Sequence, residues 1–316
     1  MENKLDDGKV DVSIVVPLYN EEESLPELTK AIEEALAATF KYEIIFVDDG
    51  STDRSFAVVQ QLSINDKRVK GISFRHNYGK SVALQAGFER VQGDYVVTMD
   101  ADLQDDPNEV PEMIAMLKGG LDLVSGWKKE RFDPISKTVP SKFFNFVTRK
   151  AAGIHLHDFN CGLKAYRKEV VENIYLYGEL HRYIPMLAKQ EGFTRIGEKV
   201  VKHHPRKYGK TKFGLSRFIN GFLDLITILF VQKYFQKPMH FFGSVGILLL
   251  SAGTVVNLYL ASIKILFGVG IGDRPLLFLG ILLMVLGVQF LSTGLIGELV
   301  NINHVRRQKP NIREQF

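Results

Sequence analysis

The chain has 316 residues, of which 46% are apolar and 24% are charged, and its formal net charge is +4. So small a charge gives no argument for nucleic-acid binding, and the single cysteine, Cys161, excludes an internal disulfide bond. The mean hydropathy is close to zero, which is high for a chain this rich in charge and indicates that the apolar residues are concentrated in particular segments.

Residues 1–9 are polar and acidic, so we expect no signal peptide and a first domain that stays on the side of synthesis. From residue 12 onward, short β-branched runs alternate with amphipathic segments. Strands are expected at residues 12–17, 43–48, 69–74, 95–100 and 121–125, and helices at residues 22–38, 55–64, 80–90 and 109–118. The alternation predicts an α/β domain with a mostly parallel sheet over residues 1–212, whose ligands bind outside the carboxyl ends of the strands.

The first three strands end in polar loops. Residues 17–22 offer an aromatic ring and acceptors suited to stacking on and pairing with a base, and residues 47–53 form an acidic turn. Lys80 starts the helix after the third strand, where it could face a phosphate. Turns rich in Asp and Gly also form without any function. The GxGxxG fingerprint of dinucleotide-binding folds is missing from the sequence.

The fourth strand runs into alternating polar residues. Asp100, Asp102 and Gln104 lie two residues apart, so in an extended chain their side chains share one face. Their oxygens are ligands that Mg²⁺ or Mn²⁺ accepts. A solvated acidic loop that caps the next helix would also explain them, because residues 105–107 form a plausible helix start. The pattern alone leaves both interpretations open.

Residues 141–152 and 213–237 mix aromatic or aliphatic side chains with basic ones, and we expect both to be interfacial helices at a membrane surface. A core helix of the first domain is the alternative for residues 213–237. Together the two segments would seat the site against the lipid headgroups.

Residues 241–263 and 276–297 carry no charge, and each is long enough to cross a hydrocarbon core of about 30 Å. A buried helix pair in a soluble bundle is the alternative. Basic residues precede and follow the pair, which predicts a two-helix transmembrane hairpin over residues 238–300 and a basic cytoplasmic tail over 301–316. We therefore expect an inner (plasma) membrane protein whose catalytic domain and C-terminus are cytoplasmic. Glycines that would permit close packing of these helices, and hence homo-oligomers, are Gly243, Gly246, Gly280, Gly287 and Gly294.

Seven short motifs carry a family resemblance. The strand-end motifs are VVPLYNE at residues 15–21, VDDGSTD at 47–53, NYGK at 77–80 and DADLQ at 100–104. They resemble those of the inverting family 2 glycosyltransferases of GT-A fold. The later motifs resemble its polyprenyl-phosphate branch, which includes dolichol-phosphate mannose synthases and the bactoprenol glucosyltransferases of GtrB type; they are HDFNCG at residues 157–162, ELHRYIP at 179–185 and RKYGKTK at 206–212. The resemblance covers residues 10–300.

The resemblance implies a nucleotide-sugar donor, a polyprenyl phosphate acceptor and inversion at the anomeric carbon. The acceptor phosphate is already mostly anionic at pH 7, so no strong general base is needed. The candidate catalytic residues are Asp102, Asp158 and Arg206, with Arg206 assisting at the diphosphate by family analogy and Mg²⁺ or Mn²⁺ held by Asp100, Asp102 and Gln104. Asp158 could orient the acceptor or a sugar hydroxyl, and a simple cap of the segment that begins at Phe159 is the alternative. The implied nucleotide-sugar site consists of Pro17, Tyr19, Asn20, Glu21, Asp48, Lys80, Asp100, Ala101 and Asp102.

Arg131, Ser141 and Lys142 are the candidates for the acceptor phosphate, because arginine matches phosphate oxygens with its planar fork. Basic side chains that snorkel at a membrane surface are the alternative for each of them. The resemblance favours transfer of glucose from UDP-glucose to undecaprenyl phosphate, with GDP-mannose as the main alternative donor.

Two other functions are considered. A processive polysaccharide synthase shares the fold, but such enzymes usually carry a QxxRW motif, and the only tryptophan here is Trp127. A non-catalytic lipid-binding or translocation partner is disfavoured by the intact set of Asp100, Asp102 and Gln104. The sequence therefore favours an enzyme that makes a polyprenyl-phosphate sugar for cell-envelope glycosylation.

Overall fold

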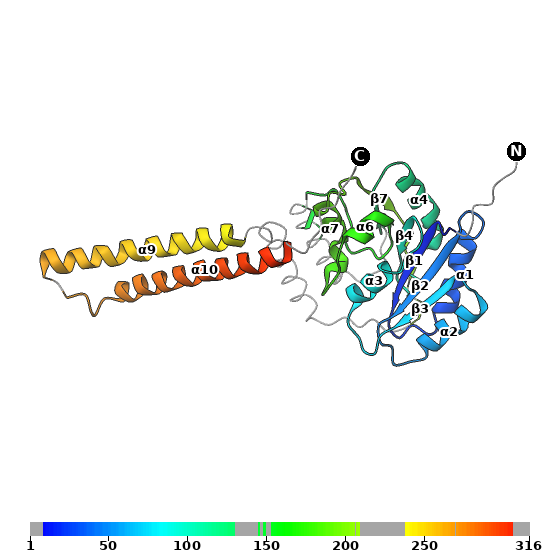
Figure 1. Cartoon of the computed structure of the whole chain (residues 1–316), viewed down its shortest axis with the longest axis horizontal. Helices are drawn as coiled ribbons and strands as arrows, with labels where there is room; N and C mark the ends of the chain where they lie inside the picture. Colours follow the sequence, from blue (N-terminus) through cyan, green and yellow to red (C-terminus); the bar gives the residue numbers. More distant parts are fainter. Residues whose placement is uncertain are drawn as a thin grey trace. The chain divides into compact units, whose positions relative to one another are not determined.

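Figure 1 shows the computed structural model of the chain, which describes residues 9–129, 145, 148–149, 153–205, 207–208, 238–268 and 270–305. The chain divides into two compact units, Met1–Gly221 and Phe222–Phe316. The first unit is the α/β domain and the second contains the two apolar helices.

The described part of the first unit is built around one seven-stranded sheet with the strand order β3-β2-β1-β4-β6-β5-β7. The strands are β1 (Val12–Leu18), β2 (Tyr42–Asp48), β3 (Val69–Ser73), β4 (Tyr95–Thr98), β5 (Leu123–Trp127), β6 (Lys164–Arg167) and β7 (Ile196–Val200). All neighbouring strands run parallel except β6, which is antiparallel to both β4 and β5. The mostly parallel α/β fold that the sequence predicts is confirmed, although β6 and β7 were not expected from the sequence.

Helices cover both faces of the sheet. One hydrophobic core joins the sheet to α1 (Leu25–Leu36), α2 (Ser55–Asn65) and α4 (Val110–Lys118). The other joins it to α3 (Lys80–Phe88), α6 (Lys168–Asn173) and α7 (Ile184–Gln190). Two short 3₁₀ helices, η1 (Pro107–Glu109) and η2 (Leu180–Tyr183), precede α4 and α7. With both faces covered, the carboxyl ends of the parallel strands are the place where polar side chains gather.

The central strands read as almost continuous apolar runs because both of their faces are buried. The helix expected at residues 22–38 is shorter in the structure, since Ser24 precedes its first turn and Pro26 lies in that turn. Close approach of α3 to the sheet requires a glycine, because a Cβ on Gly87 would lie 2.3 Å from Cγ1 of Val15. That contact fixes the helix that carries Lys80.

The second unit contains α9 (Pro238–Phe267) and α10 (Pro275–Val305), which pack against each other. Glycines allow the close approach, since a Cβ on Gly253 would lie 2.6 Å from the carbonyl oxygen of Gly280. The segments Pro238–Phe267 and Pro275–Leu299 are long and apolar enough to cross a membrane, and most of their most apolar stretch is not buried by protein. A core helix of a soluble protein would instead be mostly buried.

Candidate active site

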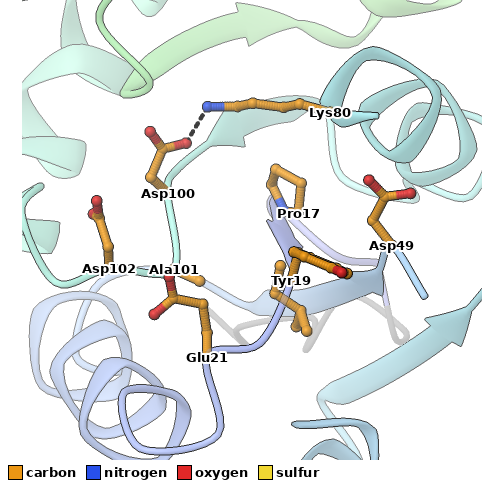
Figure 2. Close-up of a pocket in the computed structure, with 9 residues that line it drawn as sticks. Pro17, Tyr19, Glu21, Asp49, Lys80, Asp100, Ala101 and Asp102 are labelled. Atoms are coloured by element: carbon orange, nitrogen blue, oxygen red, sulfur yellow. Dashed lines mark hydrogen bonds and ion pairs between the residues drawn. The ribbon is translucent and has the colours of Figure 1, made fainter. Parts of the chain in front are cut away.

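A pocket lies at the carboxyl ends of β1 and β4, the edge where the sequence predicts ligands (Figure 2). Its lining residues are Pro17, Leu18, Tyr19, Glu21, Asp49, Lys80, Asp100, Ala101 and Asp102. Figure 2 shows the Lys80 ammonium directed at the Asp100 carboxylate. The described lining therefore combines four acidic side chains with one cation and an aromatic ring.

Asp100 lies two residues after the end of β4 and is held from several sides. Its Oδ1 contacts Nζ of Lys80, and its backbone N–H donates to Oδ2 of Asp105 at 3.4 Å. Gly162 backs the carboxylate so closely that a Cβ there would lie 2.6 Å from Cγ and Oδ2 of Asp100. Burial raises the pKa of Asp100, but the charges of Lys80 and Lys128 outweigh it and bring that pKa down to about 2. Asp100 is thus ionised at neutral pH.

The turn after Asp100 separates Asp102 from Gln104. Leu103 between them has a φ of 58°, a left-handed conformation that is uncommon for a bulky side chain. Oδ1 of Asp102 accepts a long hydrogen bond from the Gln104 N–H at 3.3 Å, while the Gln104 amide donates to the carbonyl oxygen of His204 at 3.5 Å. Asp102 lines the pocket and Gln104 does not.

The donor set fits a hard divalent cation with an incomplete protein shell. Asp100 and Asp102 present carboxylate oxygens to the same pocket, and Mg²⁺ is commonly held by one or two carboxylates together with substrate phosphates and water. Within the described ranges, His, Cys, Asp and Glu side chains form no cluster of three that could hold a metal ion by themselves. The remaining ligands would therefore have to come from a substrate or from water.

Asn20 lies beside the pocket rather than in its lining. Its side-chain oxygen accepts the Thr52 N–H at 2.8 Å, and its own N–H donates to Oγ of Ser51 at 2.9 Å. Asn20 has a φ of 57°, which this short polar residue tolerates better than most. It ties the loop after β1 to the loop after β2 and so positions its neighbours Tyr19 and Glu21.

The acidic turn after β2 contains two adjacent carboxylates that accept different hydrogen bonds. Asp48 is 2% exposed and accepts hydrogen bonds from Ser51 N–H at 3.0 Å and Ser73 Oγ at 2.8 Å. Asp49 lines the pocket and accepts the N–H groups of Tyr78 at 2.7 Å and Gly79 at 2.9 Å, while its burial raises its pKa. Sequence reasoning selected Asp48 and missed Asp49. Successive residues of an extended segment face opposite sides, and that alternation was the signal that could have separated them.

Lys80 reaches the pocket from the first turn of α3. The preceding Gly79 has a φ of 94°, which only glycine adopts readily. The next residue, Ser81, is buried, and its Oγ accepts the N–H of His181 at 3.0 Å and contacts Nδ1 of the same residue at 3.0 Å. Burial, with the charges of Lys80 and Arg182, lowers the pKa of His181 well below its usual value, so this imidazole is neutral at pH 7.

Asp158 lies outside the pocket lining and is 1% exposed. Its Oδ1 accepts the N–H of Asn160 at 3.0 Å, and its own N–H donates to Oε1 of Glu198 at 3.1 Å. The neighbouring His157 donates its N–H to the same Glu198 oxygen at 2.7 Å and stacks on Trp127 with ring centroids 4.0 Å apart. Asp158 is therefore built into a rigid loop at the ends of β5 and β7.

Several expected site residues lie outside the described residues: Arg131, Ser141, Lys142 and Arg206. The same holds for the expected interfacial helix at 213–237, for the one at 141–152 apart from residues 145, 148 and 149, and for residues 306–316 of the tail. Their roles remain predictions from the sequence.

The family match and the similar proteins agree with one another. The family described as glycosyl transferase family 2 matches residues 13–175. A dodecaprenyl-phosphate galacturonate synthase from Rhizobium johnstonii is 36% identical over 315 residues, which is 97% of this chain and 93% of that protein. An undecaprenyl-phosphate 4-deoxy-4-formamido-L-arabinose transferase from Pseudomonas aeruginosa is 36% identical over 91% of this chain and 84% of its own length.

Among solved structures, glucosyl-3-phosphoglycerate synthase from Mycobacterium tuberculosis is similar in fold. The complex of that enzyme with Mn²⁺ and UDP-glucose superimposes with a TM-score of 0.53 at 21% identity, covering 71% of this chain and 79% of the other. At this identity the similarity establishes the fold alone.

Proposed function

Because the chain belongs to glycosyl transferase family 2, we propose that it transfers one sugar from a nucleotide donor to a membrane polyprenyl phosphate. The observation that carries the proposal is the meeting of Asp100, Asp102 and Lys80 in one pocket at the carboxyl ends of the strands. Support comes from relatives over nearly the whole chain whose names specify a dodecaprenyl or undecaprenyl phosphate.

The donor chemistry follows from the charges of the pocket. Asp100 and Asp102 would hold Mg²⁺ or Mn²⁺, which supplies Lewis-acid stabilisation of the leaving nucleoside diphosphate. Lys80 places a second positive charge beside the same diphosphate. Tyr19 and Pro17 offer apolar surface to the base or sugar, and the solved M. tuberculosis enzyme of this fold binds Mn²⁺ with UDP-glucose.

The acceptor side would use Asp158 and residues that follow β5 and β7 in the sequence. Asp158 lies in a loop held by Glu198, and Arg131, Ser141, Lys142 and Arg206 would bind the lipid phosphate and the diphosphate as the sequence predicts. Since the acceptor phosphate is mostly ionised at pH 7, the protein needs only to bring it in line with the anomeric carbon.

The second unit would anchor the enzyme at its lipid substrate. α9 and α10 are exposed, apolar and long enough to span a bilayer. We propose that they form a hairpin in the inner membrane, with residues 1–212 and the basic tail on the cytoplasmic side. Glycines that were expected to permit oligomers, such as Gly246 and Gly287, contact each other within this pair.

UDP-glucose is the donor we propose first, with GDP-mannose second. The relatives' names add galacturonate and 4-deoxy-4-formamido-L-arabinose to the sugars worth testing. The proposed divalent-cation pocket and a polyprenyl phosphate acceptor would serve any of these four sugars, so the sugar is a separate question from the reaction class.

The test offers membranes that contain the chain a panel of radiolabelled nucleotide sugars and measures label in the organic phase. Label from one donor, released by mild acid as a single sugar, is the expected result. Asp102→Ala should abolish the transfer, whereas Asp94→Ala, which removes a half-exposed carboxylate paired with Lys9, should leave it unchanged. A polymeric product would indicate a processive synthase, and no label from any donor would indicate a non-catalytic lipid-binding partner.

A further inference from the structure

Positive charge surrounds the Asp100 carboxylate before any ligand is present. The Lys80 ammonium contacts Oδ1 of Asp100. Lys128 forms an ion pair with Asp105 at 2.8 Å, and its charge also stabilises ionised Asp100. Lys164 is 3% exposed, bonds to the carbonyl oxygen of Cys161 and interacts electrostatically with Asp100. A further cation at Asp100 therefore meets three ammonium groups.

Lys80 and Asp100 both line the pocket, and the Lys80 ammonium contacts Oδ1 of the Asp100 carboxylate there. Gly162 packs against the same carboxylate, with a virtual Cβ 2.6 Å from Cγ of Asp100. The side chains of Lys80 and Asp100 are one-third exposed, at 33% and 32%, so their contact faces solvent and the ligand. A cation that coordinates Oδ1 of Asp100 from the pocket would compete with this ammonium group.

We propose that Lys80 is a movable counter-ion, which holds Asp100 in the empty pocket and passes to the donor diphosphate when a divalent cation binds. The proposal rests on the metal site of the proposed function and adds a consequence to it: metal and nucleotide bind interdependently. The metal alone binds weakly because it must displace Lys80 without any new partner for that ammonium. A diphosphate supplies the partner.

Charge balance gives the physical reason. A divalent cation within about 4 Å of an ammonium group is repelled, and in a partly desolvated pocket that repulsion is screened less than in water. The nucleoside diphosphate brings negative oxygens that attract both cations at once. Thermodynamic linkage then requires that the nucleotide strengthen metal binding by the same factor as the metal strengthens nucleotide binding.

A purely structural ion pair is the competing explanation, in which Lys80 only fastens α3 to the end of β4. The two explanations predict opposite changes in metal affinity when Lys80 is removed. A movable counter-ion suppresses metal binding, so its removal tightens the metal. A structural clamp positions Asp100, so its removal loosens the metal and lowers the thermal stability.

The experiment measures free Mn²⁺ by electron paramagnetic resonance on the full chain in detergent, with and without UDP. The variants are Lys80→Met, Asp102→Asn and the matched control Lys30→Met, which removes an exposed ammonium of α1 whose described ion-pair partner is Glu34. Complexes of Mn²⁺ with UDP in solution are the same for every variant, so differences between variants report on the protein.

We expect wild type and Lys30→Met to bind Mn²⁺ weakly alone and at least tenfold more tightly with UDP. Lys80→Met should bind Mn²⁺ alone roughly tenfold more tightly than wild type, and UDP should then add little. Unchanged or weaker Mn²⁺ binding by Lys80→Met, together with Asp102-dependent binding in wild type, overturns the counter-ion role and leaves the proposed function intact. Mn²⁺ binding that Asp102→Asn does not reduce, even with UDP, overturns the metal site and the counter-ion role together.

Discussion

Replacing Gly162 with alanine should damage the chemistry of the pocket while leaving the fold almost intact. The new Cβ would lie 2.6 Å from Cγ and Oδ2 and 2.8 Å from Oδ1 of Asp100. Ordinary contacts of this kind begin near 3.4 Å, so the carboxylate must move by roughly 1 Å. Gly162 has no positive φ that would strain an alanine backbone. Gly162→Ala should therefore displace mainly the Asp100 side chain.

The expected size of the effect follows from that displacement. A misplacement of about 1 Å at a reacting centre can cost about 100-fold in rate, which corresponds to about 2.7 kcal/mol of transition-state stabilisation. Asp100 is one-third exposed and can swing toward the pocket. Overpacking in a closed core typically costs about 1–3 kcal/mol, so the loss of folding free energy at this open site should be about 1 kcal/mol or less. Sugar transfer should fall far more than stability.

The assay compares kcat/KM for sugar transfer and the thermal midpoint of Gly162→Ala with those of Gly71→Ala. A Cβ on Gly71 would lie 2.7 Å from Cγ1 of Val59, in the core between β3 and α2 and away from the pocket lining. Gly71→Ala should lower the thermal midpoint and keep kcat/KM. Transfer by Gly162→Ala within about threefold of wild type would refute the claim that close packing of Gly162 sets the position of Asp100.

Three further predictions concern the charged groups around the pocket. Lys128→Met leaves the buried Asp105 carboxylate without its 2.8 Å ion pair, which should cost about 3–5 kcal/mol of stability in chemical denaturation. The double variant with Asp105→Asn should recover part of that loss. No recovery would contradict the pairing of the two residues. His181 has a pKa below its unfolded value near 6.5, so stability should fall as the pH drops below about 6.5, by at most about 1.4 kcal/mol per pH unit. Thermal melting at several pH values should show a shallower slope for His181→Asn than for wild type. Glu198→Gln weakens the acceptor for the His157 and Asp158 N–H groups. Those two backbone amides should therefore exchange hydrogen at least several-fold faster. Unchanged exchange would count against Glu198 as the support of the loop that carries Asp158.

The sequence predicts residues at the ends of parallel strands well because topology alone brings those ends together. Tyr19, Lys80 and Asp100 come from three separate loops, and each was placed at a strand or helix end by local pattern. Once β1, β2, β3 and β4 pair in parallel register, the three must share one edge of the sheet. No knowledge of side-chain packing is needed for that inference.

The choice between adjacent residues requires more than local pattern. Asp48 and Asp49 are equivalent by composition, but Asp48 is the last residue of β2, opposite Leu18, whereas Asp49 follows the strand and lines the pocket. Gln104 likewise shares the two-residue spacing of the acids before it, but that spacing implies a common face only while the chain is extended. The left-handed Leu103 ends the extended segment, so Gln104 turns toward His204 instead.

Gly162 shows where local pattern fails altogether. It supports Asp100 only because β6 enters the sheet antiparallel between β4 and β5, with Thr98 opposite Lys164 and Lys164 opposite Ser125. β6 is four residues long and has a basic residue at each end, so it has neither the length nor the alternation by which a strand is predicted. Burying Lys164 in such a strand carries a desolvation cost, which lowers the pKa of its ammonium. The features that make β6 a poor strand by sequence are therefore the ones that bring a glycine and a buried cation next to Asp100.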